Sequence, residues 1–152
     1  MLFRSGIKEP KATFSACFGS PFMPRPASVY AKMLGEKILD HNTVVYLINT
    51  GWSGGPYGVG KRISIKYSRA MVTAALTGKF DLKKFRHDDT FNLDVPTECP
   101  DVPSDVLDPK NTWIDKDSYD LSAKKLAQMF SENFTKFKDV SPEIKNAGPQ
   151  IQ

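Results

Sequence analysis

A glycine-rich segment followed by two basic residues carries the clearest chemistry in this sequence. Five of the ten residues from 51 to 60 are glycine, and Lys61 and Arg62 follow directly. Residues 55–61 have the Gly-x-x-x-x-Gly-Lys spacing of a phosphate-binding P-loop, in which backbone N–H groups surround a phosphate and the lysine neutralises it. Arg62 stands where a P-loop needs Ser or Thr to hold magnesium. The following residues, 63–65, predict extended chain instead of a helix.

Two other interpretations of the same segment stay open. The glycines can serve a tight turn, in which the backbone approaches itself closely near the end of a strand. Alternatively, the planar guanidinium of Arg62 can stack on an adenine ring while neighbouring backbone groups bind the edge of the base. This last interpretation requires no magnesium ligand.

The rest of the chain offers little covalent or acid–base chemistry. His41 lies at a predicted helix end and His87 in a predicted charged loop, and neither is beside a nucleophile motif. The carboxylates between 88 and 108 lack the order of a calcium loop, so we interpret them as solvated turn residues. Cys17 and Cys99 have no Cys-x-x-Cys partner, which favours two reduced thiols. We therefore assign no catalytic residue and no metal ligand to this chain.

A strand and two helices are predicted on either side of the glycine-rich segment. Pro26 and the apolar residues at helical spacing after it predict a helix over 27–40. The β-branched and aromatic run 44–48 predicts a strand that is buried on both faces. An Ala-rich stretch beyond the glycines predicts a helix over 68–77, closed by Gly78. The resulting order is strand, glycine-rich loop and helix.

The second half combines an irregular stretch with one strong helix. Four prolines forbid a long helix between 81 and 117, which we expect to be an ordered loop or a linker. Apolar residues at helical spacing then predict a helix over 118–137, capped by Asp115, Asp117 or Ser118. We expect the apolar stripe of this helix to pack against the rest of a parent domain; it consists of Leu121, Leu126, Met129, Phe130, Phe134 and Phe137. The predicted fold class is α/β, a mixed sheet fragment with flanking helices.

The length of 152 residues, with 40% hydrophobic and 25% charged residues, fits one globular domain or a piece of a larger one. No apolar run approaches the roughly 20 residues of a membrane span, and the start lacks a secretory signal. We therefore expect no membrane partner and a cytoplasmic location. The net charge is +4, but residues 1–80 hold 11 Lys and Arg against 3 Asp and Glu, and residues 81–152 hold 10 against 14. We therefore expect an anionic ligand to bind to residues 1–80, the basic half of the chain.

Five segments of the chain carry motifs of one family, in the order that the family has them. They are 13–19 (TFSACFG), 45–52 (VYLINTGW), 58–66 (GVGKRISIK), 96–100 (PTECP) and 107–113 (LDPKNTW). Together they resemble the carboxy-terminal portion of ATP-dependent phosphoenolpyruvate carboxykinase. The resemblance implies that residues 1–152 are the carboxy-terminal part of the ATP-binding domain in a two-lobed enzyme.

That resemblance also implies an activity and a site. Such an enzyme of gluconeogenesis decarboxylates oxaloacetate and transfers the γ-phosphate of ATP to the enolate, giving phosphoenolpyruvate and CO₂. It uses Mg²⁺ with the nucleotide and a second divalent ion, often Mn²⁺, at the substrate. In the family, the positions matching Arg62, Ile63 and Ser68 contact the adenine of ATP, and that of Ser68 is commonly threonine.

The same resemblance implies that essential parts lie elsewhere. The true P-loop, the metal ligands and the arginine that holds oxaloacetate belong upstream of the matching segments. The expected partner is therefore the remainder of the enzyme chain, and we expect these residues alone to be inactive, because phosphoryl transfer needs metal ions and a phosphate cradle.

A second hypothesis is a stand-alone, non-catalytic module that binds a nucleotide or RNA through the basic first half. Aromatic and basic residues interleave from Lys61 to Tyr67, as they do on nucleic-acid surfaces. A net charge of only +4 is low for such a surface. If the chain is part of the carboxykinase, we predict no nucleic-acid partner. We keep the stand-alone module as the alternative.

Overall fold

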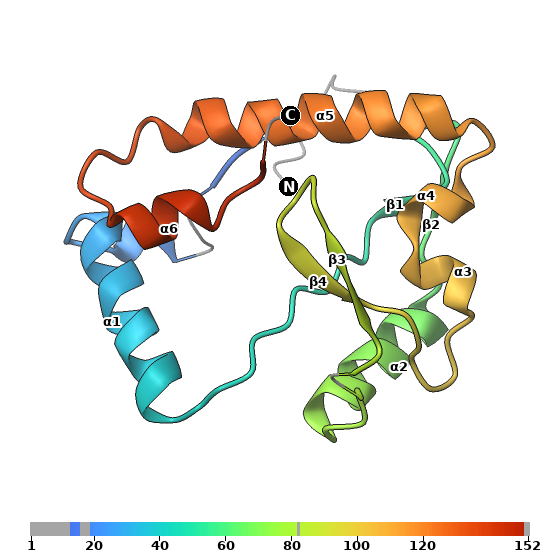
Figure 1. Cartoon of the computed structure of the whole chain (residues 1–152), viewed down its shortest axis with the longest axis horizontal. Helices are drawn as coiled ribbons and strands as arrows, with labels where there is room; N and C mark the ends of the chain where they lie inside the picture. The colour runs from blue at the N-terminus through green and yellow to red at the C-terminus, as the bar shows by residue number, and fades with distance from the viewer. Residues whose placement is uncertain (1–12, 16–18, 82, 151–152) are drawn as a thin grey trace. The chain divides into compact units, whose positions relative to one another are not determined.

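The computed structural model describes residues 13–15, 19–81 and 83–150 (Figure 1). The chain divides into two compact units, residues 1–43 and 44–152. The first contains a 3₁₀ helix, η1 (Ser20–Phe22), and the helix α1 (Ala27–Asp40). The predicted helix over 27–40 is confirmed, with Pro26 as its N-cap and His41 as its C-cap.

The strand predicted over 44–48 does not form in the structure. These residues belong to no helix or strand, and Val44, Val45 and Leu47 are 58%, 62% and 79% exposed. A run that is apolar on both faces becomes a buried strand only where neighbouring strands and covering helices are present. The described residues supply neither for this run.

The glycine-rich segment closes a short hairpin in front of a helix. Strand β1 (Trp52–Ser53) pairs antiparallel with β2 (Lys61–Arg62). Helix α2 (Ile65–Leu76) follows, one turn earlier than the helix predicted over 68–77. The extended continuation predicted for 63–65 is therefore wrong at its end, because the Ser64 hydroxyl accepts the backbone N–H of Lys66 at 3.2 Å and starts the helix.

The stretch from 81 to 117 is more regular than the expected loop or linker. It contains an antiparallel hairpin of β3 (Phe85–Asp88) and β4 (Leu93–Pro96), and two single-turn helices, α3 (Ser104–Leu107) and α4 (Pro109–Thr112). His87 therefore lies in a strand and not in a loop. The α/β class with flanking helices is confirmed, and the strands of the described residues form two separate antiparallel pairs.

The core of the second unit forms where α2 meets the chain around α3. Its buried residues are Ala74, Cys99, Val102 and Leu107, with Tyr67, Ala70, Met71, Phe80 and Val106 packed against them. Few side chains of the described residues are fully buried, so burial of this core contributes modestly to stability.

The helix predicted over 118–137 is confirmed as α5 (Lys116–Phe134), and a short helix, α6 (Pro142–Asn146), follows it. Asp115 is the N-cap of α5, and its carboxylate accepts the N–H groups of the first turn. The buried residues of α5 are Ala123 and Ala127, whereas Leu121 of the predicted stripe is 71% exposed. Packing of that stripe against the rest of a parent domain stays a prediction.

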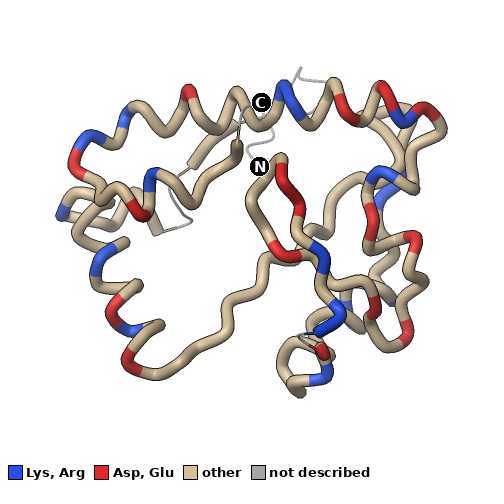
Figure 2. Tube along the Cα trace, in the orientation of Figure 1, with Lys and Arg blue, Asp and Glu red and all other residues tan. Residues whose placement is uncertain are grey.

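Basic and acidic residues are interspersed along the β3–β4 hairpin and along α5 (Figure 2). Neither element therefore consists of charged residues of one sign alone. Among the described residues, no helix combines the length and the apolar character needed to cross a membrane.

Candidate functional site

The glycine loop (residues 54–60) is a tight turn held by its own backbone. Gly54, Gly55 and Gly58 have φ values of +79°, +148° and +88°, which residues with side chains rarely adopt. The N–H groups of Val59 and Gly60 both donate to the carbonyl of Pro56, at 3.1 and 2.9 Å. The geometry therefore bears out the tight-turn interpretation.

The same geometry differs from a P-loop in two respects. In a P-loop the lysine lies at the start of a helix, whereas Lys61 lies in β2, and α2 begins at Ile65. The N–H groups of Val59 and Gly60, which a phosphate would need, are already bonded to Pro56. The phosphate-cradle interpretation is therefore not supported.

Arg62 has the exposure that a base-stacking residue needs. Its side chain is exposed, and it takes part in none of the ion pairs found among the described residues. It stands opposite Trp52 in the hairpin, and Trp52 meets Tyr57 edge-on with ring centroids 5.4 Å apart. Sequence reasoning gave neither aromatic residue a role, although both lie among the glycines. A planar cation beside two partly exposed rings can accept a flat, aromatic ligand.

The other two predicted site residues lie immediately after the hairpin. Ile63 is half-buried, and its N–H donates to the carbonyl of Gly51 at 2.9 Å. Ser68 is half-buried in the first turn of α2, where its N–H donates to the carbonyl of Ser64. Arg62 and Ile63 are thus adjacent, and the Ser64 cap sets the position of Ser68 relative to them.

The hairpin is also tied to a distant part of the chain. Ser53 Oγ donates a hydrogen bond to Thr112 Oγ1 at the end of α4, at 3.0 Å. The two residues are 59 positions apart in sequence, and neither was singled out from its type or spacing. A serine beside glycines and a threonine in a proline-containing segment give no signal that they meet.

The remaining titratable groups of the described residues do not assemble a catalytic set. The hydrogen bond between His87 Nδ1 and Asp94 Oδ1, at 3.0 Å, raises the pKa of His87. Burial raises the pKa of the Cys99 thiol, which keeps this free cysteine protonated and unreactive. Cys17 lies outside the described residues. Across the described part of the chain, no group of three or more His, Cys, Asp and Glu could hold a metal ion.

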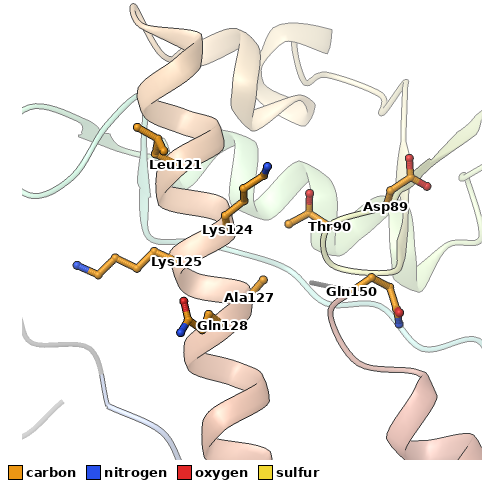
Figure 3. Close-up of a pocket in the computed structure, with 8 residues that line it drawn as sticks. All are labelled: Asp89, Thr90, Leu121, Lys124, Lys125, Ala127, Gln128 and Gln150. Carbon is orange, nitrogen blue, oxygen red and sulfur yellow. The ribbon is translucent and has the colours of Figure 1, made fainter. Parts of the chain in front are cut away.

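A cavity lies beside α5 and the tip of the β3–β4 hairpin (Figure 3). It is a cavity of about 390 Å³, lined by Asp89, Thr90, Leu121, Lys124, Lys125, Ala127, Gln128 and Gln150. In Figure 3, Lys124 points toward Thr90 while Lys125 points away. The Gln150 amide already donates to the carbonyls of Asn146 and Gly148. The cavity is lined by none of the residues predicted for the site, whereas the hairpin carries Arg62, so we keep the hairpin as the stronger candidate.

The comparisons with known proteins agree on one family. The family described as Phosphoenolpyruvate carboxykinase matches residues 3–105. The "Phosphoenolpyruvate carboxykinase (ATP)" of Caldanaerobacter subterraneus subsp. tengcongensis is 63% identical over 145 residues, which are 95% of this chain and 28% of the relative. Its namesake in Fusobacterium nucleatum is 60% identical over 146 residues (95% and 28%), and that of Thermus thermophilus is 51% identical over 148 (97% and 28%). The chain thus spans about 28% of the length of these relatives.

Proposed function

Since the chain belongs to the phosphoenolpyruvate carboxykinase family, we propose that it supplies the adenine side of the ATP site in an ATP-dependent enzyme of this family. The complete enzyme converts oxaloacetate and ATP into phosphoenolpyruvate, ADP and CO₂. Residues 1–152 are then the carboxy-terminal part of its ATP-binding domain. The observation that carries the proposal is the exposed Arg62, unpaired by any described carboxylate, at the end of a glycine loop whose backbone is internally bonded.

Each site residue has a role that fits its surroundings. Arg62 stacks its guanidinium plane on the adenine, because a delocalised cation loses little hydration on contact with an aromatic face. Ile63 adds apolar contact beside the ring, since its backbone is fixed by the bond to Gly51. The Ser68 hydroxyl binds the edge of the base. Together they orient the nucleotide and do not touch the transferred phosphoryl group.

Metal ions and the phosphate cradle come from the remainder of the enzyme. We propose Mg²⁺ with the nucleotide and Mn²⁺ at oxaloacetate, where they neutralise the charge that develops during phosphoryl transfer. The described residues of this chain offer no ligand group for either ion. Exposed apolar residues such as Val44, Val45 and Leu47 are the surface that we expect the remainder of the chain to cover.

The proposal is tested in a complete enzyme that carries this segment, by changing Arg62 to Ala. ATP binding should weaken by about 1 to 2 kcal/mol, the range for a desolvated cation on an aromatic ring, while the oxaloacetate affinity stays unchanged. Ser68→Ala should cost less, roughly 0.5 to 1.5 kcal/mol for one neutral hydrogen bond. Titration calorimetry with ATP measures both effects.

Two further variants distinguish a loss of stacking from a loss of charge and from an unspecific effect of removing an arginine. Arg62→Lys keeps the charge but loses the plane, so its affinity should fall between those of the wild type and Arg62→Ala. Arg69→Ala removes another exposed arginine, on α2, that joins none of the described ion pairs, and it should leave ATP binding unchanged. An unchanged ATP dissociation constant in well-folded Arg62→Ala protein would remove Arg62 from the site.

The alternative, a stand-alone module that binds a nucleotide or RNA, is not favoured, because the relatives above are named as the ATP-dependent enzyme. The genomic DNA upstream of Met1 separates the two. An in-frame continuation that encodes a P-loop and metal-ligand residues supports the enzyme, whereas a promoter with a ribosome-binding site directly upstream supports the module.

A further inference from the structure

The glycine loop is anchored from outside the hairpin by the end of α4. Ser53 Oγ donates to Thr112 Oγ1 at 3.0 Å, and Thr112 Oγ1 donates in turn to the carbonyl of Pro109 at 2.7 Å. Gly54 touches the same place, since a side-chain Cβ there would lie 2.9 Å from the Thr112 carbonyl oxygen. Loop and helix are therefore in direct contact through both a hydrogen bond and close backbone approach.

On the α4 side of this contact, hydrogen bonds to residues outside the glycine loop hold the helix in place. A four-residue helix is not stable by itself. Asp108 caps it by accepting the N–H of Lys110 at 3.2 Å, and the same carboxylate pairs with Arg86 Nη2 of β3 at 3.1 Å. Lys116 Nζ holds the other end through the carbonyls of Lys110, Asn111 and Trp113, at 2.8 to 2.9 Å. Thr112 thus projects from a segment that is bonded at both ends.

On the loop side, the N–H groups of Val59 and Gly60 close the turn on the carbonyl of Pro56, but these bonds lie within the loop and do not attach it to α4. Residues 56–59 are exposed, and glycine backbones lose much conformational freedom on ordering. Ser53 stands directly opposite Lys61 in the hairpin, and Lys61 precedes Arg62. An anchor at Ser53 therefore restrains the strand that carries Arg62.

We propose that Thr112 is a positioning residue of the nucleotide site: through Ser53 it holds the glycine loop so that Arg62 meets the base in a preset position. This inference rests on the proposed function, because it gives a role in ATP binding to a residue that does not touch ATP. Preorganisation of this kind lowers the entropy that binding must remove, so its loss weakens affinity without removing any ligand contact.

The test compares variants of a complete enzyme that carries this segment. Ser53→Ala removes only the bond between the two segments, and Thr112→Val removes its acceptor together with the bond from Thr112 to the carbonyl of Pro109. Each should raise the ATP dissociation constant about three- to tenfold, the range for one neutral hydrogen bond, and the double variant should be no worse than the more affected single variant. Thr112→Ser keeps the hydroxyl and should restore wild-type affinity.

Thr97→Val is the matched control. Its hydroxyl also makes one hydrogen bond, to the carbonyl of Lys84 at 2.9 Å, and this bond involves neither the glycine loop nor α4. It should leave ATP affinity unchanged even if it lowers the melting temperature. A merely structural role for Thr112 would make the two threonine variants behave alike.

Trypsin cleavage after Lys61 and Arg62, measured without nucleotide, reports how firmly the glycine loop is held, independently of ATP binding. Ser53→Ala should speed cleavage at these bonds, and Thr97→Val should not. An unchanged ATP dissociation constant in folded Ser53→Ala, together with a weakened Arg62→Ala, overturns the positioning role and leaves the proposed function standing. If Arg62→Ala also binds ATP normally, both the proposed adenine site and the positioning role of Thr112 are refuted.

Discussion

The hairpin β1–β2 and the hairpin β3–β4 join antiparallel strands by different means. In the first, each strand has two residues, and the turn is closed by glycine backbone and by the anchor from Ser53 to Thr112. In the second, each strand has four residues, and charged side chains connect it, with His87 bonded to Asp94 directly across the strands. The first hairpin should therefore be sensitive to added side chains and the second to pH and salt.

The largest effect that we expect comes from a methyl group in the first hairpin. A Cβ at Gly60 would collide with the carbonyls of Ser53 and Gly55, which belong to rigid backbone. Gly60→Ala should lower the free energy of unfolding by about 3 kcal/mol, the upper range for overpacking. Chemical denaturation of the complete enzyme measures the loss.

Gly35→Ala serves as the control for this prediction. Gly35 lies within α1, and a Cβ there meets nothing within 4 Å. The change should stabilise by roughly 0.5 to 1 kcal/mol, because alanine loses less backbone entropy in a helix than glycine. Equal losses for both variants would refute the steric argument for the glycine loop.

A smaller effect should follow from removing the cap between β2 and α2. Ser64→Ala leaves the N–H of Lys66 without its side-chain acceptor and should lower stability by about 1 kcal/mol. Ser64→Gly should cost only a few tenths of that, since glycine is tolerated at the N-cap. Because the cap lies between Arg62 and Ser68, both variants should be titrated with ATP as well. A Ser64→Ala protein as stable as the wild type would place the start of α2 elsewhere.

The smallest effect should appear in the second hairpin as a dependence on pH. The hydrogen bond to Asp94 raises the pKa of His87 above 6.5, so the folded hairpin binds the proton more tightly than the unfolded chain. Its contribution to stability is then fully present below pH 6.5 and is lost as the pH rises through the raised pKa. NMR titration of the His87 ring follows this directly.

Two carboxylate variants distinguish the partners of His87. Asp94→Asn removes the 3.0 Å partner and should return the pKa of His87 toward its ordinary value. Asp89→Asn removes a carboxylate at 4.0 Å and should lower the pKa less. Because these groups are exposed, added salt should reduce the shift. Salt-independent titration, or equal effects of both variants, would show that the cross-strand contact is not what connects this hairpin.

The local sequence pattern was sufficient to predict an element wherever that element is stabilised by its own residues. Apolar spacing after Pro26 placed α1, and the same spacing placed α5 with Asp115 as one of three candidate caps, because both helices depend on residues three or four apart. The family motifs around Arg62 could also be recognised from the sequence, since they are runs of adjacent residues. The β3–β4 hairpin was missed because its strands are short and charged and lack apolar alternation.

The sequence by itself determined the family, the two main helices and the position of the glycine-rich turn, all of which depend on neighbouring residues. Only the tertiary structure decided that Lys61 lies in a strand, that Val44, Val45 and Leu47 remain exposed, and that Ser53 bonds to Thr112. The physical reason is range. A helix or turn depends on contacts between residues a few positions apart, whereas the anchor of the glycine loop joins residues 59 positions apart and exists only after both segments have folded.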